Sequence, residues 1–257
     1  MILPVKFKRP FNNENMLSYL LGMNEAKRMF ALNRIRIGLV FKTTSVSRYP
    51  DSTAYMNSFS RKFSNVHDIG CSDGSASLSL MENLSYLNYF GLDLNISVKI
   101  IKSGQNYFLM DENENIHMYE NRYLRVYLDP FTVQKKFSER FISWIFRCNP
   151  GLNSEVTNVD LVNPECKKIR NVKFKNFDLF NDQLKEKSDL IIIFNLLNKF
   201  EDAGTLKKVK SFLLKNLNEN GIALIGENEP YEKATVYKKN RKLNIVKLIN
   251  GGSSTIF

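Results

Sequence analysis

The amino-acid sequence predicts an α/β fold of the doubly wound class, in which helices cover both faces of a mostly parallel β-sheet. The first observation is a short apolar segment, 66–69, that runs through a turn with two glycines into a helix opened by small residues. A strand, glycine turn and helix in this order are typical of such folds. The second is the recurrence of strand-like segments at 89–95, 172–180 and 188–197. The third is a pair of alternating runs between Lys233 and Ile249 around a polar turn, which predicts an antiparallel hairpin.

Length and composition exclude several classes of protein. The chain has 257 residues, of which 43% are hydrophobic and 25% charged. These values are typical of soluble globular proteins and exclude collagen-like, wholly disordered and disulfide-stapled chains. The longest apolar runs fall far short of the roughly 20 residues that span a bilayer, and the basic N-terminus lacks the apolar region of a secretory signal. We therefore expect a cytoplasmic protein without a membrane segment.

The cysteines and histidines form no recognisable metal or disulfide pattern. Cys71, Cys148 and Cys166 are far apart and make no Cys-x-x-Cys pair. Reduced thiols are therefore expected, with neither a disulfide framework nor a structural zinc site. His67 and His117 are isolated from each other. We expect structural or solvated roles for both.

The net charge of +11 is unevenly distributed along the chain. Residues 1–66 hold 11 Lys/Arg against 3 Asp/Glu, a net of +8, whereas 67–129 hold 4 against 9, a net of −5. A basic lobe beside an acidic centre can attract nucleic acid, an acidic protein or an anionic substrate. Simple solubility is the alternative, because the cations are dispersed rather than clustered.

The N-terminal part is predicted to be a helical lobe over residues 1–63. Apolar residues recur every three or four positions in 14–42, which predicts one or two amphipathic helices. A further short helix is expected over 53–63. The sequence then changes to strand, turn and helix, so we expect a core domain over 64–257.

The segment from Asp68 to Gly74 carries the clearest functional signal. Glycine at the end of a parallel strand allows a sharp turn and lets a ligand approach the main chain. The amides that open the next helix can donate hydrogen bonds to an anionic group. About 20 residues later a second strand ends in Asp93, whose carboxylate can accept from both hydroxyls of a ribose. Together these features predict an adenosine-type ligand. A nicotinamide dinucleotide fits less well, because Ser72 replaces the second glycine of that fingerprint and the final spacing is shorter.

The glycine turn and the Asp93 strand resemble the first two motifs of class I S-adenosylmethionine-dependent methyltransferases, which usually carry Gly-x-Gly-x-Gly after an acidic residue. Three later segments follow in that family's order, namely 172–180 as the third strand, 188–197 as the fourth strand, and 212–226 as a helix, a turn and the fifth strand. The resemblance implies S-adenosylmethionine as cofactor and a Rossmann-like, seven-stranded sheet, in which an antiparallel last strand is inserted beside the fifth. It implies as cofactor-binding residues Asp68, Gly70, Cys71, Ser72, Gly74, Asp93, Leu94, Asp178, Leu179 and Asn195.

The implied roles differ from residue to residue. By the resemblance Asp178 bonds the adenine amino group, and Asn195 lies at the strand end that meets the reacting methyl. The alternative for each Asp and Asn is a helix cap or turn residue, because these residue types favour such positions. Ser72 departs from the family's glycine, although the turn can accept a small residue.

Two short segments are similar to the chemotaxis-receptor methyltransferases in their placement. One is 41–50, which precedes the glycine turn, and the other is 194–200, which follows the fourth strand. By this weaker likeness Thr44 and Arg48 reach the methionine end of the cofactor, with Arg48 pairing its carboxylate. Solvation of Arg48 at the surface is the alternative.

Between the second and third strands the chain is too long for a single crossover helix. Strand-like stretches at 106–111 and 115–128 and a helix over 131–146 with Trp144 are expected there. We predict a substrate-facing subdomain over 96–171. A cap on one edge of the sheet is the alternative.

The leading hypothesis is a methyltransferase that acts on a small molecule or a protein side chain. Methyl transfer from a sulfonium needs alignment more than catalytic groups, so no catalytic residue is assigned. Glu227 and Glu229 are candidate bases for an oxygen acceptor, although solvation is more common. An RNA methyltransferase using the basic lobe and an inert nucleoside-binding module are the alternatives. DNA amino-group methylation is disfavoured, because Asn195 is not followed by prolines.

Overall fold

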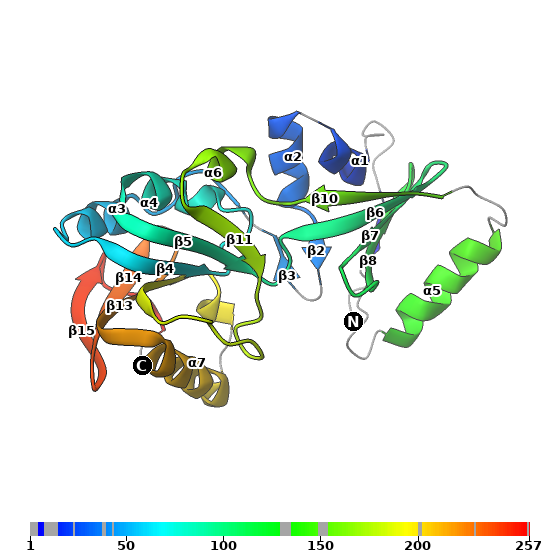
Figure 1. The fold of residues 1–257 in the computed structure, drawn as a ribbon. Coiled ribbons are helices and arrows are strands. Elements are labelled where there is room, and N and C mark those ends of the chain that lie inside the picture. Colours follow the sequence, from blue (N-terminus) through cyan, green and yellow to red (C-terminus); the bar gives the residue numbers. More distant parts are fainter. Residues whose placement is uncertain are drawn as a thin grey trace. The chain divides into compact units, whose positions relative to one another are not determined.

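The computed structural model describes residues 5–7, 15–22, 24–37, 40–42, 44–128, 135–148, 154–199, 202–228, 230–255 and 257. The chain forms two units (Figure 1). The insert unit comprises residues 1–44 and 97–161, and the core unit comprises residues 45–96 and 162–257. This grouping differs from the expected one, because 45–63 fold with the core unit and 1–44 fold with the insertion.

The core unit is built on a seven-stranded sheet with the order β11-β5-β4-β12-β13-β14-β15. Its strands are β4 Phe63–Ile69, β5 Tyr86–Asp93, β11 Val172–Asn176, β12 Ser188–Phe194, β13 Leu217–Glu227, β14 Lys233–Asn240 and β15 Lys242–Ile249. The strands from β11 to β13 are parallel, and the last two are antiparallel. The predicted mostly parallel, seven-stranded sheet with a C-terminal hairpin is therefore confirmed. The strand order reverses between β4 and β12, and open α/β sheets bind ligands at the carboxyl ends beside such a switch point.

Side chains on the central strands alternate between two apolar layers. On β12, Leu190 and Ile192 pack into one layer, whereas Ile191 and Ile193 pack into the other. The first layer is covered by α3 Pro50–Asn57, α4 Leu78–Asn83 and α6 Pro164–Lys168, and the second by α7 Ala203–Asn216 (Figure 1). Burial on both faces explains why this strand is continuously apolar in sequence. Helices on both faces confirm the doubly wound class.

The C-terminal hairpin departs from the family pattern in its strand order. The hairpin turns at Arg241, whose φ is +59°. β14 pairs directly with β13, and β15 lies at the edge of the sheet. The resemblance implied a last strand inserted beside the fifth, and this expectation is wrong. The chain instead adds its last two strands as a simple meander, which a short turn allows.

The C-terminal tail is held against the core unit by hydrogen bonds of Ser254 and Phe257. Ser254 donates from its amide and its hydroxyl to the Glu227 carboxylate, at 3.0 and 2.6 Å. The Phe257 amide donates to the Tyr237 hydroxyl at 3.3 Å, and the two rings pack together. The buried Glu227 therefore anchors the tail. Its predicted role as a base has no support in these contacts, and Glu229 lies outside the described residues.

The insert unit contains a six-stranded antiparallel sheet with the order β1-β9-β8-β7-β6-β10. Its strands are β1 Val5–Phe7, β6 Ser97–Ser103, β7 Asn106–Met110, β8 Ile116–Glu120, β9 Leu124–Tyr127 and β10 Ser154–Asp160. A small ribbon pairs β2 Arg36–Ile37 with β3 Val40–Phe41. The strand-like stretches at 106–111 and 115–128 are confirmed, whereas β6 and β10 were not predicted.

Helices cover both faces of the insert sheet. α1 Met16–Leu21 and α2 Glu25–Leu32 share an apolar cluster with one face, and α5 Lys135–Cys148 packs Ile145 against the other. The predicted helix over 131–146 corresponds to α5, and residues 131–134 lie outside the described ones. Trp144 on this helix is 56% exposed. Within the described ranges, the helices are too short or too polar to cross a membrane.

Candidate functional site

The turn after β4 is held in an unusual backbone conformation. Gly70, Ser72 and Gly74 have φ angles of +76°, +58° and +85°. Gly70 and Cys71 both donate their amides to the carbonyl oxygen of Leu92 on the neighbouring strand, at 2.7 and 3.2 Å. The left-handed region is free of strain only for glycine, so two of the three residues suit it and Ser72 does not.

The glycines of this site make room for the protein's own side chains. A Cβ added to Gly74 would lie 2.8 Å from the Phe174 ring, and one added to Gly91 would lie 2.4 Å from it. A Cβ on Gly70 would lie 3.2 Å from Leu196. The sequence suggested that these positions let a ligand approach the main chain. In the structure, packing of Phe174 and Leu196 already accounts for the missing side chains.

Asp93 ends β5 beside this turn and faces it. Its carboxylate oxygens accept hydrogen bonds from the Ser72 amide at 2.8 Å and from the Asn95 amide at 3.1 Å. The side chain is half-buried, and Leu94 next to it is 60% exposed. The structure therefore brings Asp93 and Ser72 together, as the sequence predicted.

Asp68 lies beneath the turn instead of at its surface. It is 2% exposed and accepts a hydrogen bond from the Tyr89 hydroxyl at 3.0 Å. Burial raises the pKa of Asp68 to about 6, against the opposing effect of hydrogen bonds from Ser77 and Tyr89. These contacts describe a group that supports the turn from within. A direct contact between Asp68 and a ligand stays a prediction.

The strand end next to Asp93 carries Asp178. The Phe177 amide donates to the carbonyl oxygen of Asp93 at 2.8 Å, which joins β11 to β5 beyond their last paired residues. Asp178 accepts from the Phe180 amide at 2.8 Å and so closes a local turn. Leu179 is buried, whereas the Phe180 side chain is 42% exposed. Two exposed apolar side chains, Leu94 and Phe180, thus follow adjacent strand ends.

Asn195 follows β12 and is joined to the end of β13. Its φ is +53°, its amide donates to the Gly226 carbonyl at 2.9 Å, and its side-chain oxygen accepts from the Asn228 amide at 2.8 Å. The Asn228 side chain donates in turn to the Arg48 carbonyl at 2.6 Å. Sequence reasoning missed Asn228, because no local pattern distinguishes it.

Arg48 is brought to the same edge of the sheet by its backbone. Its amide donates to the Ala76 carbonyl at 3.1 Å, just after the glycine turn. The next residue, Tyr49, stacks on Phe194 with ring centroids 3.8 Å apart. Burial raises the pKa of Tyr49 well above its usual range, and the charge of Asp68 adds to the effect. Thr44 is different: it belongs to the insert unit, where its amide donates to Asn33 at 2.7 Å, and its contact with a cofactor stays a prediction.

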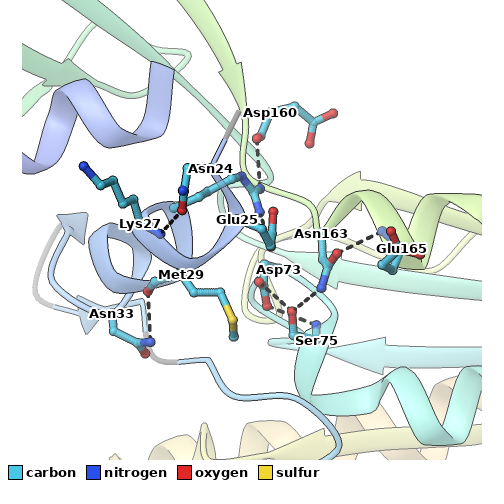
Figure 2. Close-up of polar contacts among 11 residues, drawn as sticks. Asn24, Glu25, Lys27, Met29, Asn33, Asp73, Ser75, Asp160, Asn163 and Glu165 are labelled. Carbon is cyan, nitrogen blue, oxygen red and sulfur yellow. Dashed lines mark hydrogen bonds and ion pairs between the residues drawn. The ribbon is translucent and has the colours of Figure 1, made fainter. Parts of the chain in front are cut away.

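A polar network that the sequence did not reveal braces the far side of the turn (Figure 2). Asp73 is 1% exposed and accepts from the amide and the hydroxyl of Ser75, at 3.0 and 2.8 Å. Asn163 donates from its side chain to the Ser75 hydroxyl at 2.7 Å and from its amide to the Asp73 carbonyl at 2.8 Å. Its side-chain oxygen caps α6 by accepting from Glu165 at 2.9 Å. The turn is thereby tied to the chain that returns from the insertion.

Both histidines make structural contacts, and the Cys166 thiol is buried. His67 shares a 2.6 Å hydrogen bond with Ser188, and burial, helped by Lys175, lowers its pKa to about 4. His117 lies 2.9 Å from the Asp111 carboxylate and is fully buried. Burial raises the pKa of the Cys166 thiol to about 12. Among the described residues, no group of three or more His, Cys, Asp or Glu side chains could hold a metal ion.

Two polar atoms at this edge have no hydrogen-bond partner within the described chain. They are the Ser72 hydroxyl oxygen and the Asn228 side-chain oxygen, and both atoms are buried. Buried polar atoms are usually paired, so each such exception calls for a physical explanation.

No family model and no curated protein matches the chain. Solved structures match part of it. The N-methyltransferase NodS from Bradyrhizobium japonicum, in complex with S-adenosyl-L-homocysteine, is similar over 68% of this chain and 58% of its own, at 14% identity and a TM-score of 0.36. A TehB-like methyltransferase from Corynebacterium glutamicum is similar over 72% and 63%, at 14% identity and a TM-score of 0.35. The chain thus spans less than two thirds of these proteins, and its fold assignment rests on its own strand order. The likeness to chemotaxis-receptor methyltransferases gains no support and stays a prediction.

Proposed function

We propose that this protein is an S-adenosylmethionine-dependent methyltransferase whose core unit binds the cofactor at the carboxyl ends of β4, β5 and β11. The observation that carries the proposal is the 2.8 Å hydrogen bond between the Ser72 amide and the Asp93 carboxylate. It joins the glycine turn to the acidic end of the adjacent strand, next to the switch point of the sheet. This is the arrangement that holds a ribose beside a tight turn.

The residues present fit an adenosine-type cofactor. A carboxylate offers about four acceptor positions, so Asp93 can accept from ribose hydroxyls as well as from the Ser72 and Asn95 amides. The exposed side chains of Leu94 and Phe180 supply apolar surface for the faces of an adenine ring. Asp178 precedes Phe180 by two residues, and its assigned role is to accept from the exocyclic amino group. At the other end of the site, Arg48 supplies a cation for the carboxylate of the methionine moiety.

The chemistry that the bound cofactor supplies is a methyl group activated by a sulfonium charge, so the protein has to align the nucleophile and exclude water. Asn195 is fixed for this purpose by its bonds to Gly226 and Asn228. The stacked rings of Tyr49 and Phe194 close the apolar layer below this strand end. A general base is not assigned, because Glu227 is engaged by the C-terminal tail.

The proposed acceptor is a small molecule or a protein side chain. RNA is the alternative, motivated by the net charge of +8 in residues 1–66. Retention on RNA across a salt series separates the two, because several phosphate contacts give a steep loss of affinity with salt. A flat response favours the small-molecule or protein acceptor. A steep one identifies RNA.

Isothermal titration calorimetry of the full chain tests the cofactor. We expect saturable binding of S-adenosylmethionine and S-adenosylhomocysteine, and none of NADH at the same concentrations. Absence of binding to both adenosyl ligands contradicts the proposal. Binding without methyl transfer across a panel of amine, hydroxyl and protein acceptors reduces the function to that of a binding module.

A further inference from the structure

Ser72 is unfavourable in the chain for two independent reasons. Its φ of +58° belongs to the left-handed region, which glycine adopts without strain. Its hydroxyl oxygen is buried and has no partner among the described residues, and an unmade hydrogen bond of a buried hydroxyl costs stability. A glycine would remove both penalties. The side chain therefore points to a partner that the polypeptide does not supply.

The position of Ser72 beside Asp93 indicates what that partner is. The Ser72 amide donates to the Asp93 carboxylate at 2.8 Å, and the hydroxyl lies only three covalent bonds from that nitrogen. A ligand hydroxyl bound by Asp93 is therefore within reach of the Ser72 side chain. The residue as a whole is half-buried, so a change of the χ1 rotamer is enough to turn the hydroxyl toward a ligand without moving the backbone.

We propose that the Ser72 hydroxyl is a second ribose-binding group, which shares the 2′,3′-diol of the cofactor with Asp93. This inference rests on the proposed function and deepens it. It assigns to the site a requirement for a ribonucleoside with its sugar hydroxyls intact. Asp93 accepts from the diol, and the Ser72 hydroxyl can both donate to it and accept from it. The other unpartnered atom at this edge is the Asn228 side-chain oxygen. The amide nitrogen of the same side chain donates to the Arg48 carbonyl, so Asn228 is tied to Arg48 and not to the Asp93 carboxylate.

The test uses Ser72→Ala and Ser72→Gly in the full chain. Both variants remove the unpaired hydroxyl, and glycine also relieves the backbone. Without ligand, we expect a thermal midpoint equal to that of the wild type or about 2–4 °C higher. The affinity for S-adenosylhomocysteine should fall about 3- to 10-fold through loss of one hydrogen bond. Opposite effects on stability and affinity are the signature of a ligand contact, because a merely structural residue lowers both.

Ser52→Ala is the matched control. The Ser52 hydroxyl is also buried and unpartnered, but it lies in the first turn of α3, where its amide is bound by Glu232 at 2.8 Å. Its removal should leave the affinity for S-adenosylhomocysteine unchanged. The 2′,3′-dideoxy analogue of that ligand provides a second arm, and the Ser72 variants should bind it as well as the wild type does.

Each outcome bears on a different statement. Wild-type binding with unchanged affinity of both Ser72 variants overturns the inference and leaves the proposed function standing. An equal loss for the dideoxy analogue overturns the assignment to the ribose. Failure of the wild type to bind S-adenosylhomocysteine overturns both the function and the inference.

Discussion

Replacement of Asp93 by Ala removes the carboxylate on which the cofactor site depends. In the structure this group accepts two backbone amides, at 2.8 and 3.1 Å, in a half-buried position. Hydrogen bonds to a charged group contribute about 1.5–3 kcal/mol each, and partial exposure places these at the lower end. We therefore expect the free energy of unfolding to fall by about 1.5–3 kcal/mol. The loss of contacts to a ribose diol should weaken S-adenosylhomocysteine binding roughly 10- to 150-fold, the equivalent of the same energy range.

Calorimetric titration measures the affinity, and urea denaturation measures the stability. Asp202→Ala is the matched control, because the Asp202 carboxylate also accepts a backbone amide, that of Thr205 at 2.7 Å, as the cap of α7. Loss of this cap should lower the stability and leave the affinity unchanged. An Asp93 variant that binds within twofold of the wild type refutes the reasoning. So does an Asp202 variant that loses as much affinity.

Three further predictions concern the support of the site. Burial raises the pKa of Asp68 to about 6 from 3.8, so the protonated group stabilises the fold fully below pH 3.8, and this contribution is lost as the pH rises through 6. The free energy of unfolding of Asp68→Asn should therefore rise, relative to that of the wild type, by up to about 3 kcal/mol between pH 4 and pH 8. A difference between the two proteins that stays constant over this range in urea denaturation contradicts the prediction. Gly74→Ala should lower the free energy of unfolding by about 1–3 kcal/mol, because its Cβ would lie 2.8 Å from the Phe174 ring at a φ of +85°. An unchanged thermal midpoint contradicts this prediction. Glu232 accepts the first-turn amides of α3 at 2.9 and 2.8 Å, and Glu232→Ala should lower stability by about 1–2 kcal/mol in urea denaturation, whereas Glu232→Gln should retain most of it.

The parts of the fold that the sequence predicted are those with a local signal. β12 is buried on both faces, β4 ends at the glycine turn and β5 ends in Asp93, so each is visible as a strand-like run with a defined end. β10 Ser154–Asp160 was missed because it is an edge strand whose side chains are mostly exposed. Its side chains are polar because most of them face solvent, so the strand has no hydrophobic pattern by which it could be predicted.

The sequence predicted the site residues that lie at the ends of strands, but not the residues that contact them from distant parts of the chain. Asp93 and the glycine turn lie together because adjacent parallel strands end at the same edge. Asn163 was missed because its partner Ser75 is 88 residues away in sequence. Such a contact exists only where the chain returns from the insertion to the core unit. The pairing of Asn228 with Arg48 is of the same kind, with 180 residues between the partners.

These distant contacts explain how a turn with a strained residue keeps one conformation before any ligand binds. The Asp93 carboxylate holds the Ser72 amide on one side. On a second side, the backbone of Ser47 and Arg48 donates to the carbonyls of Ser75 and Ala76, at 3.0 and 3.1 Å. The Asn163 network holds the third side. Because the turn is already ordered, a ligand that enters loses little affinity to loop ordering. The shape of the glycine turn therefore depends on residues outside its sequence motif, such as Ser47, Arg48 and Asn163.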